Sequence, residues 1–306
     1  MLDFRESCGL RRDTHLARFA RFDRYCAEQF PEISELTCQL VHSWLDNETK
    51  IHHNLNGSAS AIRGFGKYLA AVGEQAYILM DKFSPGKTKF APYIFTDSEI
   101  SELFVAIDKM PKCSNEPFLP EIAPILFRLI YTCGLCPNEG RELLTEHVNL
   151  DTGEILITRT KQNKERIVVM SDDMLRLVSK YDFRRRIFSA DSPFFFPANN
   201  GESFSSAKIR AMLNNAWICA TCNAENPIPT KIRVYDLRHR FASVCLNRWL
   251  DEGENLMAMM PYLRAYMGHG SMNETAYYIH ILPENLIKSS AIDWDKLNAV
   301  IPEVAR

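Results

Sequence analysis

The residues best suited to chemistry lie near the carboxyl end of the 306-residue chain, in Tyr235-Asp-Leu-Arg-His-Arg240, Met267-Gly-His269 and Thr275-Ala-Tyr-Tyr-Ile-His280. These segments carry a guanidinium, imidazoles and phenols, which can hold an anion and move protons. Taken singly, Tyr278 could be a surface aromatic, Arg238 a salt-bridge partner and His269 a capping or core residue. Their order and spacing are more informative, because His269 and Tyr278 lie nine positions apart.

This arrangement resembles the tyrosine recombinases of the phage integrase family, whose signature is H-x-L-R-H, then L-G-H, then T-x-x-Y-x-H. The resemblance implies that Tyr278 is the nucleophile, Arg238 a catalytic arginine and His269 a catalytic histidine. Tyr235 stands where the family has a histidine. A phenol can bond a phosphate oxygen but cannot act as an imidazole base near neutral pH, so the proton acceptor for Tyr278 stays open. Two further residues of the segment are expected to support the site: Asp236 and His239.

The resemblance also gives a role to a lysine. The family places a lysine at the turn of a hairpin, in a pattern like G-K-G-x-K-E-R, and this chain has Thr160-Lys-Gln-Asn-Lys-Glu-Arg166. By this match Lys161 would protonate the 5′ oxygen of the cut strand, as general acid catalysis requires. Lys164 and Arg166 are expected to support the turn or to bind backbone phosphate.

One expected arginine is missing. The family has a stretch like G-L-R-x-x-E-L, where this chain reads Gly134-Leu-Cys-Pro-Asn-Glu-Gly140. Glu139 matches the supporting carboxylate, but Cys136 occupies the arginine position. Two guanidinium groups normally hold the charge that gathers on the phosphate, and losing one such donor costs about 3 to 4 kcal/mol. Arg141 lies roughly 500° further around a helix and is not expected to substitute. We therefore expect an impaired recombinase.

The elements that position these residues are mostly helical. Helical periodicity from about residue 13 to 83 indicates a small helical domain, and Arg18, Arg21 and Arg24 share one face of its first helix. That face is predicted either to contact DNA phosphate or to be a solvated stripe. Breaker residues with Lys87 and Lys89 follow, and these lysines are expected to lie along DNA. We expect a DNA-binding domain at 1–88, a linker at 89–92 and a catalytic domain at 93–306.

The second domain is predicted to be mainly α with a small β-hairpin. Thr96 and Glu99 form a capping-box pattern that predicts a helix start. Two β-prone runs between about 154 and 170 flank a polar segment and predict the hairpin. Trp217 and Trp249 are expected in the core rather than stacked on bases. The run Arg184 to Arg186 is expected to be a solvated face, with DNA contact as the alternative. The resemblance implies that the two domains form a C-shaped clamp.

Bulk composition sets further limits. The net charge of −2 gives no overall signal for nucleic acid, so DNA binding would depend on local clusters of basic residues. No apolar run of about 18 residues is present, which predicts a cytoplasmic protein without a membrane span. Nine cysteines fit reduced thiols. The pairs Cys133/Cys136 and Cys219/Cys222 suggest a zinc alternative, but their separation and flanking residues argue against it, so no metal or cofactor is expected.

Duplex DNA is the expected partner, and the resemblance implies a 3′-phosphotyrosyl intermediate. An amphipathic pattern at 283–306 is expected either to dock into a neighbouring protomer of a homo-tetramer or to pack on its own domain. Two alternatives remain open. One is a type IB topoisomerase-like enzyme, which rejoins the same strand after the same chemistry. The other is a DNA-binding homologue with little or no catalysis, an interpretation that Cys136 makes plausible.

Overall fold

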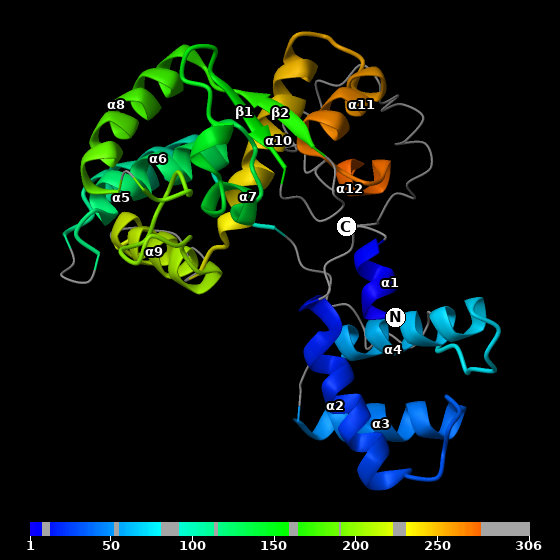
Figure 1. Ribbon diagram of the computed structural model, residues 1–306. Coiled ribbons are helices and arrows are strands. Elements are labelled where there is room, and N and C mark those ends of the chain that lie inside the picture. Colours follow the sequence, from blue (N-terminus) through cyan, green and yellow to red (C-terminus); the bar gives the residue numbers. More distant parts are fainter. Residues whose placement is uncertain are drawn as a thin grey trace, which may run out of the picture. The chain divides into compact units, whose positions relative to one another are not determined.

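A computed structural model describes residues 1–7, 13–51, 55–80, 92–112, 116–158, 165–189, 191–222 and 231–276. The chain divides into two compact units, Met1–Ala91 and Pro92–Arg306. Helices build most of both units, and the second also contains a two-stranded sheet (Figure 1). The predicted mainly helical fold with a small sheet is therefore confirmed. Lys87 and Lys89 lie outside the described residues.

The first unit has the helices α1 (Leu2–Ser7), α2 (Asp13–Gln29), α3 (Cys38–Ile51) and α4 (Asn56–Ala71). Of these, α2, α3 and α4 pack around one apolar cluster, whereas α1 has no buried residue. Trp44 and Leu45 on the buried face of α3 join Phe22 of α2 and Ile62 of α4 in this cluster. The rings of Phe22 and Trp44 meet edge to face with centroids 5.0 Å apart, a favourable aromatic geometry.

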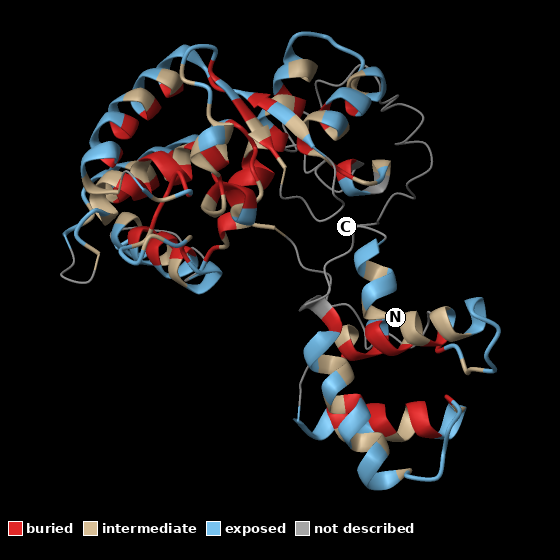
Figure 2. Cartoon of the chain, viewed as in Figure 1, coloured by how far each residue is buried: buried red, intermediate tan, exposed pale blue. Residues whose placement is uncertain are grey.

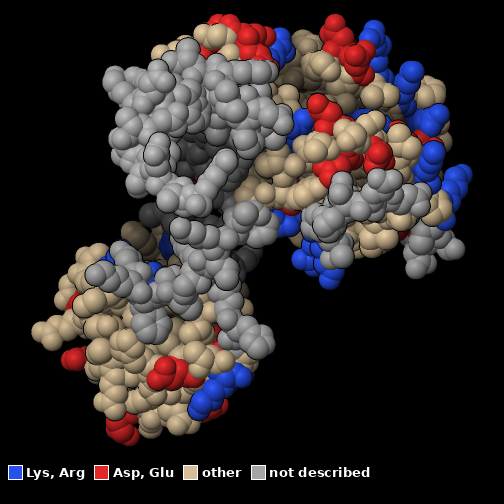
Figure 3. Space-filling view, turned by 180° about the vertical axis from the view of Figure 1, so that it is seen from behind, with Lys and Arg blue, Asp and Glu red and all other residues tan. Residues whose placement is uncertain are grey.

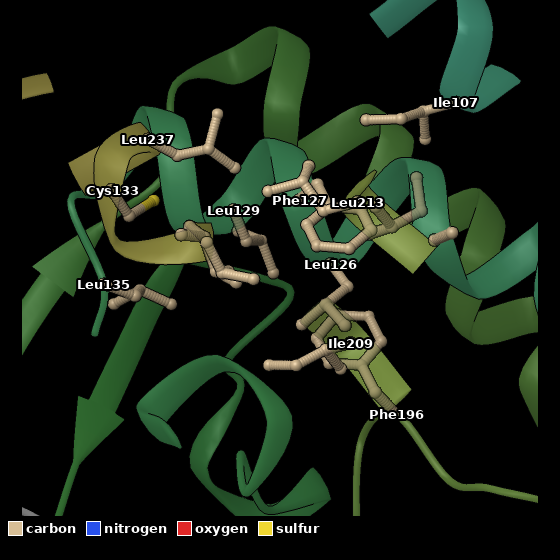
Figure 4. Close-up of a cluster of buried hydrophobic side chains, with 14 of the residues drawn as sticks. Ile107, Leu126, Phe127, Leu129, Cys133, Leu135, Phe196, Ile209, Leu213 and Leu237 are labelled. Atoms are coloured by element: carbon tan, nitrogen blue, oxygen red, sulfur yellow. The ribbon is translucent and has the colours of Figure 1, made fainter. Parts of the chain in front are cut away.

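The second unit is built around α6. Its helices are α5 (Asp97–Asp108), α6 (Leu119–Thr132), α7 (Pro137–Arg141), the 3-10 turn η1 (Thr145–His147), α8 (Asp172–Phe188), α9 (Ser206–Ala220), α10 (Val234–Asp251), α11 (Leu256–Met267) and α12 (Met272–Ala276). Buried residues occupy most of the middle of α6, as expected for a helix enclosed on several sides (Figure 2). Leu126 and Phe127 of α6 lie in one cluster with Leu213 of α9 and Leu237 of α10 (Figure 4).

Local sequence signals explain how several elements begin. The Thr96 hydroxyl accepts from the Glu99 amide over 3.3 Å, and the Glu99 carboxylate accepts from the Thr96 amide over 2.7 Å. This reciprocal capping box starts α5 as predicted. Trp217 is fully buried against Tyr93 and Phe95, so its predicted core position is confirmed.

The predicted hairpin is present as an antiparallel pair of strands, β1 (Glu154–Ile157) and β2 (Arg166–Val169). Ile155 and Ile157 of β1 and Val168 of β2 face the core, while the register pairs Ile157 with Arg166. Arg166 is thus the first residue of β2, beside the end of β1. The turn that carries Lys161 and Lys164 lies outside the described residues.

Candidate active site

Arg238 connects three separate segments of the second unit. It lies in the second turn of α10, and only 1% of the residue is exposed. Its Nη1 donates to the carbonyl oxygen of Gly134 over 2.7 Å, and its Nη2 donates to that of Met267 over 2.6 Å. Nη2 also lies 3.0 Å from Nε2 of His269. A buried guanidinium held by backbone acceptors has a fixed direction, which suits a group that must bind an anion.

His269 is held as a neutral imidazole. Gly268, with a left-handed φ of 69°, ends α11 and turns the chain into His269. Because arginine only donates hydrogen bonds, Nε2 of His269 must accept from Arg238, and Nδ1 must carry the ring proton. Nδ1 lies 2.9 Å from the Thr275 hydroxyl, which can accept a hydrogen bond from it. Burial, together with the nearby Arg238 charge, lowers the pKa of His269 to about 4.

No role follows from the sequence for Thr275, although it lies within the family-like segment. Thr275 is fully buried in the short helix α12, and its hydroxyl bonds to Nδ1 of His269, in the tautomer that the contact with Arg238 sets. The carbonyl groups of Gly134 and Met267, which hold Arg238, were likewise not predicted. Backbone acceptors leave no side-chain pattern in a sequence, so only the fold reveals them.

Cys136 and Tyr235, which both depart from the family pattern, are neighbours. The Cys136 Sγ donates to the Tyr235 hydroxyl over 3.8 Å. Burial raises the pKa of the Cys136 thiol, despite the opposing effect of Arg238. The guanidinium carbon of Arg238 lies 5.9 Å from the centroid of the Tyr235 ring, within cation–π range. The position thus offers a neutral thiol beside the phenol where a guanidinium was expected.

Glu139 forms a buried ion pair with Arg166. The Arg166 Nη1 and Nη2 donate to the two Glu139 oxygens over 2.8 and 2.7 Å. Glu139 also accepts from the Cys136 amide over 2.8 Å, and its Oε2 lies 3.8 Å from the Arg238 Nη1. Burial raises the pKa of Glu139, but these partners outweigh it and hold the pKa below its ordinary value. Glu139 is therefore a carboxylate, and Arg166 lies at the site.

The remaining residues expected to support the site are placed differently from one another. Asp236 accepts from the Arg233 amide over 2.8 Å and from its guanidinium, so it stabilises the start of α10. His239 is buried, with its ring centroid 5.2 Å from that of Tyr235. Arg141 donates to the carbonyl oxygen of Phe204 over 2.9 Å. This contact directs Arg141 toward Phe204, in agreement with the expectation that Arg141 does not replace the missing arginine.

Comparison with known proteins decides the family. The sequence profile of the phage integrase family matches residues 95–285, which is more than half of the chain. The chain belongs to the phage integrase family. The predicted resemblance to the tyrosine recombinases is confirmed, and the matched range includes Lys161 and Tyr278.

Two curated relatives support the assignment to this family. A putative integrase/recombinase, y4rB, of Sinorhizobium fredii is 28% identical over 235 residues, covering 73% of this chain and 72% of its own length. The tyrosine recombinase XerD of Rhizobium meliloti is 27% identical over 236 residues, covering 74% and 70%.

Solved structures of recombinases share the fold. The XerH site-specific recombinase, bound to palindromic difH substrate in a post-cleavage complex, has a TM-score of 0.63 at 19% identity, covering 93% of this chain and 80% of that one. The Tn1549 transposon integrase in complex with circular intermediate DNA has a TM-score of 0.63 at 14% identity, covering 96% and 97%. The fold is therefore that of the tyrosine recombinases.

In this integrase-family chain, the three arginines of α2 that were predicted to contact DNA phosphate or to form a solvated stripe differ in their surroundings. Arg21 makes a bidentate bond to Glu48 of α3, with Nε and Nη2 at 3.0 and 2.9 Å from the carboxylate oxygens. The guanidinium of Arg18 packs against Gly57 of α4. Arg24 is exposed. Arg24 is thus better placed to meet a phosphate than Arg21, whose charge is matched by Glu48.

The run Arg184 to Arg186 is only partly the solvated face that was predicted. Arg184 pairs with Glu121, whereas Arg185 is 3% exposed and donates through Nε and Nη2 to Asp182 over 2.9 and 2.8 Å. Arg186 binds the other oxygen of Asp182 over 2.8 Å. Lys and Arg side chains gather along the edge of the second unit where α8 lies (Figure 3). The prediction is wrong for Arg185, because Asp182 stabilises its charge inside the core.

Other predictions concern metals, membranes and residues that the structure does not describe. No group of three or more metal-binding side chains occurs among the described residues. Cys133 is buried, whereas Cys219 and Cys222 are exposed. None of the described helices is long and apolar enough to cross a membrane. Tyr278, Lys161, Lys164 and the segment 283–306 lie outside the described residues.

Proposed function

We propose that this chain is a site-specific DNA recombinase that cuts and rejoins duplex DNA through a 3′-phosphotyrosyl intermediate on Tyr278. The observation that carries the proposal is the buried Arg238, held by Gly134 and Met267 and bonded to His269. Membership of the integrase family supports it, as does the fold shared with XerH, which has been solved bound to its difH substrate.

The proposed chemistry is an in-line displacement at phosphorus. The Tyr278 oxygen attacks the scissile phosphate, forms a 3′-phosphotyrosyl bond and releases a 5′ hydroxyl, to which Lys161 supplies the proton. Arg238 holds a non-bridging oxygen, while His269 and Tyr235 bond the phosphate or move protons. The 5′ hydroxyl of a partner strand then displaces Tyr278. Each bond broken is replaced by one formed, so the proposal invokes neither ATP nor a metal ion.

We further propose that Cys136 slows this reaction. Burial keeps its thiol protonated, so the position offers a weak neutral donor rather than a bidentate cation. The loss of one preorganised donor corresponds to about 3 to 4 kcal/mol, or a factor of about 100 to 1,000 in cleavage rate. The same neutral thiol favours one alternative function, a homologue that binds DNA with little or no catalysis.

The proposed partners are duplex DNA and further copies of this chain. The amphipathic segment 283–306 would join neighbouring protomers of a homo-tetramer on DNA, or it would pack on its own domain. We expect the protein to act in the cytoplasm, where its cysteines would stay reduced.

The decisive experiment uses nicked suicide duplexes made from the DNA that flanks the gene, with the bound sequence first located by footprinting. Loss of the short fragment after cleavage traps the covalent adduct, which migrates slowly on a denaturing gel. We expect a faint adduct from the unaltered chain, none from Tyr278→Phe, and a stronger one from Cys136→Arg. Equal behaviour of Cys136→Arg and Tyr278→Phe would contradict the catalytic proposal and leave the DNA-binding alternative. Relaxation of supercoiled DNA without exchange would indicate a topoisomerase-like enzyme.

A further inference from the structure

Arg166 is a charged side chain close to Arg238 whose guanidinium is bonded through all three of its nitrogen atoms. Three of its donors have partners: Nη1 and Nη2 bind Glu139 over 2.8 and 2.7 Å, and Nε binds the Tyr266 carbonyl over 2.8 Å. The side chains of Arg166 and Glu139 are only 9% and 6% exposed. The charge of Arg166 is already matched by a bonded carboxylate, whereas Arg238 is held by backbone carbonyl groups, so Arg238 is the better placed of the two to hold a phosphate. The effect of Arg166 on the reaction must therefore pass through the groups it contacts.

Glu139 makes the first of these connections. Its carboxylate lies 3.8 Å from the Arg238 Nη1, beyond direct hydrogen-bond distance. Arg166 supplies the positive charge that Glu139 requires in a buried position. If that charge were removed, Glu139 would attract Arg238, the other guanidinium close to it. Arg238 would then turn toward the carboxylate, and its charge would be partly cancelled.

The Tyr266 carbonyl makes the second connection. It belongs to the last turn of α11, where the adjacent Met267 carbonyl accepts from the Arg238 Nη2 over 2.6 Å. Gly268 follows, and a Cβ at that position would lie 3.1 Å from the Arg166 Nη1, so the guanidinium packs against the helix end. Arg166 thus bonds to the Glu139 side chain in α7 and to the Tyr266 backbone in α11, next to the Met267 carbonyl that holds Arg238.

We infer that Arg166 is a positioning residue for strand cleavage, which neutralises Glu139 so that the charge of Arg238 stays available for the scissile phosphate. The inference rests on the proposed function. It differs from the expected role of Arg166 in supporting the hairpin turn or binding backbone phosphate, because Arg166 acts here through a carboxylate. It also predicts that the loss of cleavage rate on removing Arg166 comes from the uncompensated negative charge of Glu139.

A double-mutant cycle tests that cause. Arg166→Met should slow adduct formation on the suicide duplex by about 100-fold, the size of effect expected when a catalytic group is misplaced. Adding Glu139→Gln should restore most of the rate, because no carboxylate then competes for Arg238. Arg166→Lys keeps the charge and should stay much closer to the unaltered rate. Arg128→Met with Asp108→Asn, which removes a partly exposed bidentate pair between α6 and α5, should leave the rate unchanged.

A binding experiment that needs no cleavage separates this inference from the proposed function. In chains carrying Tyr278→Phe, the affinity is compared for duplexes with a phosphate or a neutral methylphosphonate at the cleavage position. We expect a preference for the charged phosphate that Arg166→Met abolishes and Arg166→Met/Glu139→Gln restores. The inference is wrong if the preference is equal in all these chains, or if the double variant is no better than Arg166→Met while both stay folded. If the preference behaves as expected but no Tyr278-dependent adduct forms, the proposed function fails instead.

Discussion

The Nη2 of Arg238 and the Nε2 of His269 lie 3.0 Å apart in a buried environment, and this contact assigns the charge state of both groups. Arginine stays protonated, so His269 must be the acceptor and must be neutral. Protonation of His269 would place two positive charges in contact away from water. A bound phosphate would reverse this balance, because its negative charge favours the protonated imidazole.

The first prediction concerns stability against pH. The pKa of His269 is lowered from 6.5 to about 4 by burial and by Arg238. Between these values the unfolded chain binds the proton more readily than the folded chain, so the free energy of unfolding falls as the pH drops from 6.5 to 4. A shift of that size corresponds to about 3 kcal/mol. Urea denaturation at several pH values should show this loss in the unaltered chain and a smaller loss in His269→Gln. Equal losses in both chains would exclude His269 as the cause.

The second prediction concerns the charge that Cys136 fails to supply. A methylphosphonate at the cleavage position has one non-bridging oxygen replaced by methyl, so less negative charge gathers during attack. Cys136→Arg should therefore accelerate cleavage of the ordinary phosphate by about 100-fold or more, and cleavage of the methylphosphonate far less. Single-turnover rates on the two duplexes measure the difference. Cys136→Ser, which is similar in size and neutral, serves as the control, and an equal gain on both duplexes would point to a change in folding.

The third prediction concerns Gly134, whose carbonyl oxygen accepts from Arg238. Its φ is 60°, and a Cβ there would lie 2.5 Å from a ring carbon of Phe241. Gly134→Ala should lower the free energy of unfolding by about 3 kcal/mol, from backbone strain and overpacking together. Gly201 has a φ of 77° and open space around its Cα, so Gly201→Ala isolates the backbone strain and should cost less. Chemical denaturation of the two variants compares them. Equal costs would rule out the contact with Phe241.

Local features of this fold could be predicted from the sequence, and long-range side-chain contacts could not. The capping box of Thr96 and the hairpin depend on residues close together in the chain, so local sequence patterns predict them. The contact of Cys136 with Tyr235 joins positions 99 residues apart, and no rule of sequence spacing predicts it. The burial of Arg185 was missed for a different reason, because its partner Asp182 is only three residues away but three successive arginines look like a solvated surface.

One buried charge did leave a signal. Glu48 falls on the apolar stripe of α3 that includes Leu40, Trp44 and Leu45, which places a carboxylate toward the core. A buried carboxylate requires a cationic partner. That requirement would have indicated an ion pair for one of the arginines of α2, although it could not have named Arg21.

The fourth prediction follows from this pair. Glu48 is 1% exposed and accepts from Arg21 and from the Ser58 hydroxyl, so Arg21→Met leaves a buried carboxylate with one partner fewer. We expect the free energy of opening of the first unit to fall by about 2 kcal/mol, measured by hydrogen exchange of the amides of α2 and α3. Arg24 is exposed on the same helix, so Arg24→Met should change stability by less than about 0.5 kcal/mol.

Arg24→Met should change the salt dependence of DNA binding more than Arg21→Met, the reverse of their order in stability. If Arg24 meets a phosphate, its loss should reduce the slope of log affinity against log salt by about 1, whereas Arg21, already matched by Glu48, should change that slope little. Titrations of a footprinted duplex at several salt concentrations measure both slopes. A loss of stability in Arg24→Met, or a changed salt slope in Arg21→Met with no loss of stability, would reverse the assignment of the two arginines.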